Sequence, residues 1–217
     1  MQVLGIGHYS RTGKNTLGSL IAAEYFKRTK KTAIVTSFAY KLKDICHQLY
    51  AWDGLREPEF YETQEGAALR DVPLPTIGKS PVQIWVDMGT PAVRDNVYDR
   101  TWIDYLLRTK RLDGASLLII TDVRFPNEVK AVREYDGILV KTVRGGYGPK
   151  NTVADLALFG WDGWDYIAGP TPRALQGDAE NLVDCLMNGW REQDPRVRHQ
   201  TLAIEGAIGQ ALATTGF

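Results

Sequence analysis

The amino-acid sequence predicts an α/β fold, in which helices flank a parallel central sheet. Near the N-terminus, short runs rich in β-branched residues alternate with longer stretches of helical spacing, as in βαβ units with right-handed crossovers. Further along, residues 117–121 form a continuous apolar run, which is typical of a strand covered on both faces. We therefore expect one domain over residues 1–190, followed by a helical tail over 191–217.

The first half of the chain supplies two strand–helix pairs and an irregular stretch. We predict strands at 2–6 and 32–36, and helices at 14–28 and 39–50. Prolines and glycines then break the periodicity between about residues 52 and 80. This stretch is expected to be an irregular insertion or lid.

The second half returns to regular periodicity. A helix begins at Pro81, because proline suits the first helical turn, and Gly89 and Pro91 are expected to interrupt it. Asp178 is expected to cap a last helix. The other predicted elements are helices at 101–111 and 127–135, strands at 117–121 and 138–143, and the capped helix at 178–190.

Composition indicates a soluble, cytoplasmic enzyme. Lys and Arg together number 26, as do Asp and Glu, so no net charge draws the chain to nucleic acid or to a membrane surface. No apolar run approaches the ~20 residues needed to cross a bilayer, and the N-terminus leads into a strand instead of a targeting segment. Cys46 and Cys185 are too isolated for a disulfide framework or a zinc site, so we expect buried, reduced thiols.

The most informative motif is residues 7–16, Gly-His-Tyr-Ser-Arg-Thr-Gly-Lys-Asn-Thr, between the first strand and the first helix. Backbone N–H groups of a glycine-bounded loop, together with the positive end of a helix dipole, bind phosphate. Lys14 would then reach the terminal phosphates of a nucleotide. The usual pattern has four residues between the glycines and Ser or Thr after the lysine, whereas here there are five, and Asn15 follows. A chance turn is the alternative interpretation.

A second candidate group follows strand 117–121. Ligands of open parallel sheets bind beyond the carboxyl ends of the strands. There Asp122 is placed to hold Mg²⁺ or its water shell, and the Arg124 guanidinium to bind a phosphate. The alternative for Asp122 is a turn or cap aspartate. Asn127 and Glu128 suit ligand contact and the start of a helix equally well.

Four segments, taken in order, resemble those of bacteriophage deoxynucleoside monophosphate kinases. Residues 11–16 resemble the family's Arg-Ser-Gly-Lys-Asp-Thr loop, and residues 37–43 its Phe-Ala-x-Pro-Leu-Lys segment, with Lys41 in place of proline. Residues 88–94, with Trp102 downstream, are similar to its Gly-Thr-Glu-x-x-Arg…Trp block. Residues 122–128 match Asp-x-Arg-Phe-x-Asn-Glu at every fixed position. The resemblance covers roughly residues 1–145.

The resemblance implies a three-layer P-loop kinase fold that passes the γ-phosphoryl group of ATP to a deoxynucleoside monophosphate. It also implies a homodimer, and a host cytoplasm if the chain is phage-encoded. Residue by residue, the implied catalytic residues are Lys14, Arg94, Asp122 and Arg124, with Asp122 also serving Mg²⁺ through water. The implied ATP-binding residues are Arg11, Thr12, Gly13, Lys14, Asn15 and Thr16. The implied acceptor-binding residues are Phe38, Ala39, Lys43, Arg94, Arg124, Asn127 and Glu128.

The chain also departs from the family pattern. Asn15 replaces the acidic residue of the loop, which leaves direct protein ligation of the metal open, and Pro91 replaces the glutamate of the third block. Beyond Arg144 we find no His-x-Ser-Glu-like element, so base recognition there is unassigned. An aromatic face suits a base, and Phe38 or Tyr40 is the expected neighbour.

Two other functions stay open on the sequence. One is a P-loop kinase for another small metabolite, and the other is a nucleotide-binding module without catalysis. A GTPase switch is disfavoured, because the sequence carries no Asn-Lys-x-Asp motif and has Asp-Val-Arg in place of Asp-x-x-Gly.

Overall fold

The computed structural model describes residues 1–109, 112, 114–150 and 152–189. These residues belong to two compact units. The first comprises Met1–Ser37 and the described residues from Leu112 onward, and the second comprises Phe38–Arg111. The helical tail expected over 191–217 lies outside the described residues.

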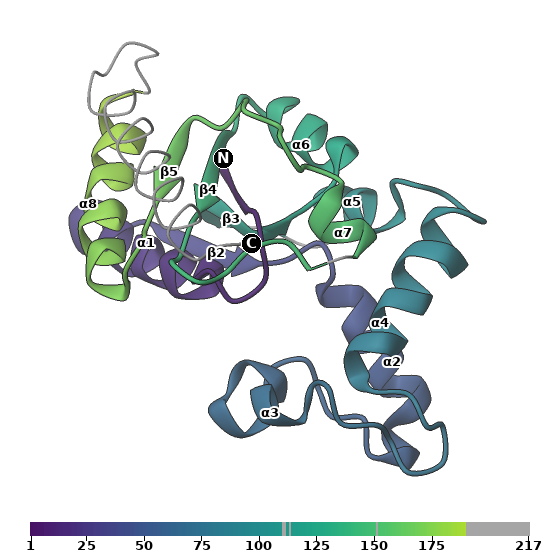
Figure 1. Ribbon diagram of the computed structural model, residues 1–217. Coiled ribbons are helices and arrows are strands. Elements are labelled where there is room, and N and C mark those ends of the chain that lie inside the picture. The colour runs from purple at the N-terminus through teal and green to yellow at the C-terminus, as the bar shows by residue number, and fades with distance from the viewer. Residues whose placement is uncertain (110–111, 113, 151, 190–217) are drawn as a thin grey trace. The chain divides into compact units, whose positions relative to one another are not determined.

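Within the part of the first unit that the structure describes, a parallel five-stranded sheet forms the centre (Figure 1). Its strands are β1 (Gln2–Gly7), β2 (Thr32–Thr36), β3 (Ala115–Val123), β4 (Ile138–Thr142) and β5 (Tyr166–Ala168). The spatial order is β2-β3-β1-β4-β5, and every neighbouring pair is parallel. This confirms the predicted α/β fold and is consistent with a P-loop kinase-like architecture. The order places β1 between β3 and β4.

Helices cover both faces of this sheet, giving three layers (Figure 1). α1 (Lys14–Thr29) and α8 (Pro172–Asn188) pack on one face. The shared core there includes Leu4, Ile6, Leu17, Ile21, Ile119, Val140 and Leu182. α6 (Pro126–Arg133) covers the other face so closely that a Cβ at Gly5 would lie 3.0 Å from the Val132 side chain. A larger residue at this position of β1 would require the neighbouring side chains to shift by a few tenths of an ångström.

The chain between β4 and the last helix, where we predicted no helix or strand, holds α7 (Val153–Leu156) and β5. The expected cap at Asp178 is wrong, because α8 begins at Pro172 and Thr171 caps it by accepting the backbone N–H of Ala174 at 3.2 Å. Asp178 is instead buried inside the helix, where it accepts the Tyr166 hydroxyl and the Gly169 N–H, each at 2.8 Å. Because these two hydrogen bonds satisfy its carboxylate, Asp178 can be buried within the helix without capping it.

The second unit is largely helical, and its longest helix is α2 (Tyr40–Tyr50) among the residues described. The stretch expected to be irregular contains a short helix, α3 (Gln64–Leu69), and single turns at Ala51–Asp53 and Phe60–Glu62. The buried Asp53 carboxylate joins the two ends of this stretch. Its two oxygens accept the Thr76 N–H at 3.0 and 3.1 Å, and one of them also accepts the Ile77 N–H at 2.8 Å.

Gly89 and Pro91 do not interrupt the helix that begins at α4 (Pro81–Asp87). The coil widens into a π-helical turn, Met88–Arg94, in which the Asp95 N–H bonds the Thr90 carbonyl at 3.0 Å. The wider turn accommodates a proline, which has no N–H to donate to the regular ladder. α5 (Thr101–Asp104) follows and continues into a second π-helical turn, Tyr105–Thr109. None of the described helices combines the length and the apolar character that crossing a bilayer demands.

Candidate active site

The motif of residues 7–16, called the phosphate loop after its predicted ligand, and the segment after β3 meet at the carboxyl edge of the sheet. β1 and β3 are neighbours, and Gly7 at the end of one pairs with Val123 at the end of the other. From these strands the chain leaves toward opposite faces, because α1 follows β1 and α6 follows β3. Such a switch point opens a crevice where ligands of parallel sheets bind.

The loop after β1 contains several residues with positive φ angles. His8, Arg11 and Gly13 have positive φ angles of 91°, 64° and 96°. In an anion-binding nest, residues of left-handed and right-handed conformation alternate and their N–H groups turn toward one side, so the positive φ angles at Arg11 and Gly13 are compatible with the predicted phosphate site. The Lys14 ammonium donates to the carbonyl oxygens of His8, at 3.2 Å, and of Tyr9. The Lys14 side chain thus folds back onto the loop with which it is predicted to bind phosphate.

Two buried threonine hydroxyls brace this loop against β4. The Thr12 hydroxyl donates to the Tyr9 carbonyl at 2.8 Å and lies 2.7 Å from the Thr142 hydroxyl oxygen. The Thr142 hydroxyl also reaches the Gly7 carbonyl at 3.2 Å. The Thr12 side chain, predicted to contact nucleotide, is therefore engaged within the protein. Sequence reasoning missed Thr142, for which the available signal was a hydroxyl residue at the end of a predicted strand.

Aromatic side chains pack over the start of the loop. The His8 ring lies against Tyr9, with centroids 3.7 Å apart and the ring planes tilted by 36°, and it meets the Trp164 ring edge-on. A Cβ on Gly7 would overlap the Trp164 ring, so this position must be glycine. Burial, followed by the positive charges of Lys141 and Lys14, lowers the pKa of His8 from 6.5 to about 3. His8 is therefore neutral near pH 7 and adds no positive charge to the loop.

Arg124 is held at its backbone by Glu128. The buried Glu128 carboxylate accepts the N–H groups of Arg124 at 2.7 Å and of Phe125 at 3.1 Å. Of the two interpretations left open for Glu128, the structure shows the helix start. Any contact of Glu128 or of the half-buried Asn127 with a ligand stays a prediction.

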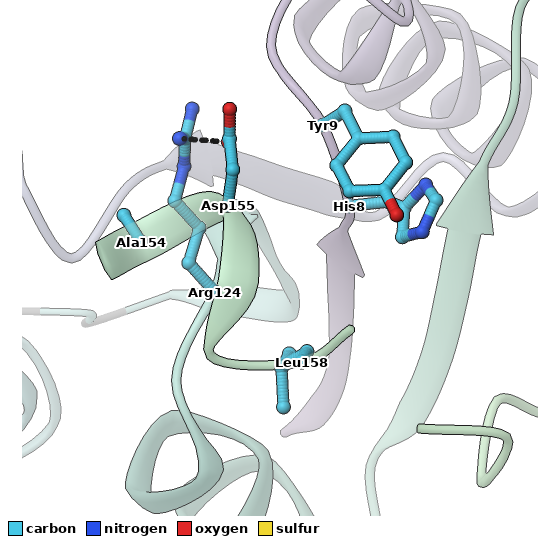
Figure 2. A pocket seen from close by; sticks show the side chains of 6 residues that line it. All are labelled: His8, Tyr9, Arg124, Ala154, Asp155 and Leu158. Atoms are coloured by element: carbon cyan, nitrogen blue, oxygen red, sulfur yellow. Dashed lines mark hydrogen bonds and ion pairs between the residues drawn. The ribbon is translucent and has the colours of Figure 1, made fainter. Parts of the chain in front are cut away.

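The Arg124 guanidinium pairs with Asp155 on α7, its Nη1 lying 3.1 Å from the carboxylate Oδ1 (Figure 2). The two side chains line a small hollow together with residues of the phosphate loop and of α7. The lining residues are His8, Tyr9, Arg124, Ala154, Asp155 and Leu158. Sequence reasoning missed Asp155. Its signal was an acidic residue closing Thr-Val-Ala-Asp, the spacing of the His-x-Ser-Glu element for which no match was found.

The remaining predicted residues of the first unit lie on β3, on the loop after β1 and on the first turn of α1. Asp122 is half-buried on β3, next to the residue that pairs with Gly7. Asn15 and Thr16 are exposed on the first turn of α1. Arg11 is exposed on the loop, and its carbonyl accepts a 3.4 Å hydrogen bond from the Arg144 guanidinium.

The other predicted residues belong to the second unit. The Lys43 ammonium pairs with Glu62 at 3.3 Å and lies 5.0 Å from the centre of the Trp85 ring. Arg94 is half-buried at the end of the π-helical turn. Of the aromatic candidates, Phe38 is 2% exposed and Tyr40 is 38% exposed. Ala39 directly precedes α2. Their roles stay predictions.

Comparison with known proteins shows sequence similarity to a viral protein. No family model matches it. The chain is 26% identical over 203 residues to a protein of Acanthamoeba polyphaga mimivirus described as "Putative deoxynucleotide monophosphate kinase". The match covers 87% of this chain and 97% of the viral protein, so it reaches well beyond the phosphate loop.

Proposed function

We propose that this chain is a nucleotide kinase that transfers the γ-phosphoryl group of ATP to a deoxynucleoside monophosphate. The observation that carries the proposal is the juxtaposition of the phosphate loop, with Lys14, and Arg124 at the switch point of the sheet. The similarity to the mimivirus protein along nearly its whole length supports the kinase class and the deoxynucleotide acceptor.

The proposed mechanism follows from charge. Donor and acceptor are both polyanions, and the transferring group spreads negative charge over its oxygens in the transition state. The loop N–H groups and Lys14 bind the donor phosphates, and the Arg124 fork stabilises the group in transit. We assign acceptor binding to Lys43 and Arg94 in the second unit. A neutral His8 takes no part as a charged group.

Asp122 is a suitable residue for a magnesium ion. Proteins hold Mg²⁺ through one or two carboxylates, with waters and substrate phosphates completing the shell. Asp122 has a half-buried carboxylate on β3, and Asn15 and Thr16 are exposed on the first turn of α1. When bound, the ion would neutralise charge on the nucleotide phosphates.

The test is a coupled assay for ADP with ATP alone and with ATP plus each of the four deoxynucleoside monophosphates. We expect at least one acceptor to stimulate turnover strongly over ATP alone, and the matching diphosphate to accumulate in equal amount to ADP. If none of them does, the deoxynucleotide proposal is wrong. Calorimetric titration with ATP then separates the two other functions left open by the sequence, each of which involves nucleotide binding, from a fold that binds no nucleotide.

A further inference from the structure

We infer that Asp155 is a positioning residue that fixes the Arg124 guanidinium for phosphoryl transfer. This inference rests on the proposed function and extends it to a residue outside the phosphate loop and the β3 segment. It is carried by the ion pair between the two side chains and by the place of both in the hollow beside the loop (Figure 2).

The Asp155 carboxylate is itself rigidly held. Its side chain is 3% exposed, and its second oxygen accepts the Lys150 N–H at 3.0 Å. The Thr152 hydroxyl accepts the Asp155 N–H at 3.2 Å and so caps the short helix α7. Each carboxylate oxygen of Asp155 is therefore held by its own donor, one by Arg124 Nη1 and the other by the Lys150 N–H, whether or not the helix is capped.

Arg124 is consequently fixed at both ends. Glu128 binds its backbone N–H, and Asp155 binds one edge of its guanidinium. A guanidinium carries five N–H donors, so an edge bound to a carboxylate leaves other donors for a phosphate. A long side chain ordered in advance loses less conformational entropy when it meets the transition state.

A carboxylate beside a phosphate site also has a cost, since it repels the anion that the site must bind. Lysine and arginine near the loop would bind phosphate more tightly without it. Asp155 is thus poorly explained as a ligand-binding residue. The arrangement is explained if Asp155 acts through Arg124 and orients its guanidinium.

The experiment compares Asp155→Asn in the wild-type and Arg124→Ala backgrounds of the full chain. Asparagine keeps the shape and an acceptor for Lys150 but removes the charge that holds the guanidinium. In the wild-type background we expect kcat to fall on the order of 10-fold to 100-fold, with the KM for ATP changed little, because the lost orientation acts on the transition state. In the Arg124→Ala background the same substitution should change kcat by less than about twofold, since its target is gone.

Thr152→Ala is the matched control, because it removes the cap of α7 and leaves both members of the ion pair. We expect its kcat to stay within about twofold of the wild type. Equal losses in both backgrounds, or an equal loss in Thr152→Ala, would assign the effect to packing of α7 and overturn the inference. Wild-type kcat in Asp155→Asn would overturn it as well. If the wild type itself shows no acceptor-stimulated turnover, the proposed function has failed instead.

Discussion

The hydroxyl of Thr142 couples the stability of the fold to the shape of the phosphate loop. It is fully buried and contacts the Gly7 carbonyl and the Thr12 hydroxyl, which in turn donates to Tyr9. Two hydroxyl protons serve these three contacts, so Thr142→Val removes one hydrogen bond and leaves a buried acceptor short of a donor. A buried hydrogen bond contributes about 1 kcal/mol and an unsatisfied group costs about 1–3 kcal/mol, so we expect about 2 kcal/mol less free energy of unfolding.

The assay is urea denaturation of the wild type, Thr142→Val and Thr142→Ser. Serine keeps the hydroxyl and loses one methyl group, which is worth ~0.8 kcal/mol of burial. We expect the valine variant to be the less stable of the two. We also expect it to bind ATP about tenfold more weakly by calorimetry, which corresponds to ~1.4 kcal/mol of loop ordering.

The reasoning fails if Thr142→Val is as stable as Thr142→Ser and binds ATP with wild-type affinity. That result would mean that the loop keeps its conformation without the bond to β4. Reduced stability with unchanged ATP affinity would separate the two effects and leave the hydroxyl a role in the fold alone.

Three further predictions concern the same loop. Lys14→Met should lower kcat on the order of 10²-fold to 10³-fold while circular dichroism and thermal unfolding stay close to wild type; near-normal turnover would remove Lys14 from the mechanism. Gly7→Ala should destabilise the fold by about 1–3 kcal/mol in urea, because its Cβ would overlap Trp164 and lie 2.5 Å from the Val123 carbonyl oxygen. The pKa of His8 falls from 6.5 to about 3 on folding, so between these pH values the unfolded chain binds the extra proton and stability declines as pH falls. His8→Gln should remove up to ~1.4 kcal/mol per pH unit of that dependence, which denaturation at about pH 7 and about pH 5 measures, and equal slopes for both proteins would contradict it.

Local patterns predicted the elements that carry the loop. The strand before it and α1 after it are short-range features, set by an apolar run, by glycine at position 13 and by helical spacing. The place of Asp122 and Arg124 at the same edge was also predictable, because parallel strands share their carboxyl ends and the run 117–121 is plainly a strand.

Contacts between distant residues could not be predicted in the same way. Thr12 and Thr142 are 130 positions apart, and Arg124 and Asp155 are 31 apart. Local sequence can suggest such a threonine or aspartate as a candidate, but it does not identify the distant residue that it contacts. The start of α8 was missed for a related reason, since Thr171 and Asp178 both suit a helix cap and only the strand beside Asp178 decides between them.

The loop after β1 and the Arg124–Asp155 pair are stabilised by different means. Substitutions in the two parts of the candidate site should therefore differ in their effects on stability and on the chemistry. In the loop, the positive φ angles of His8 and Arg11 cost about 1–3 kcal/mol each, and hydrogen bonds from buried groups offset that cost. Stability and phosphate binding therefore depend on the same bonds and should change together. The Arg124 side chain is 28% exposed, so solvent screens part of what its ion pair with Asp155 contributes to stability. Loosening the pair with Asp155 should therefore impair the chemistry while the fold stays largely as stable as before.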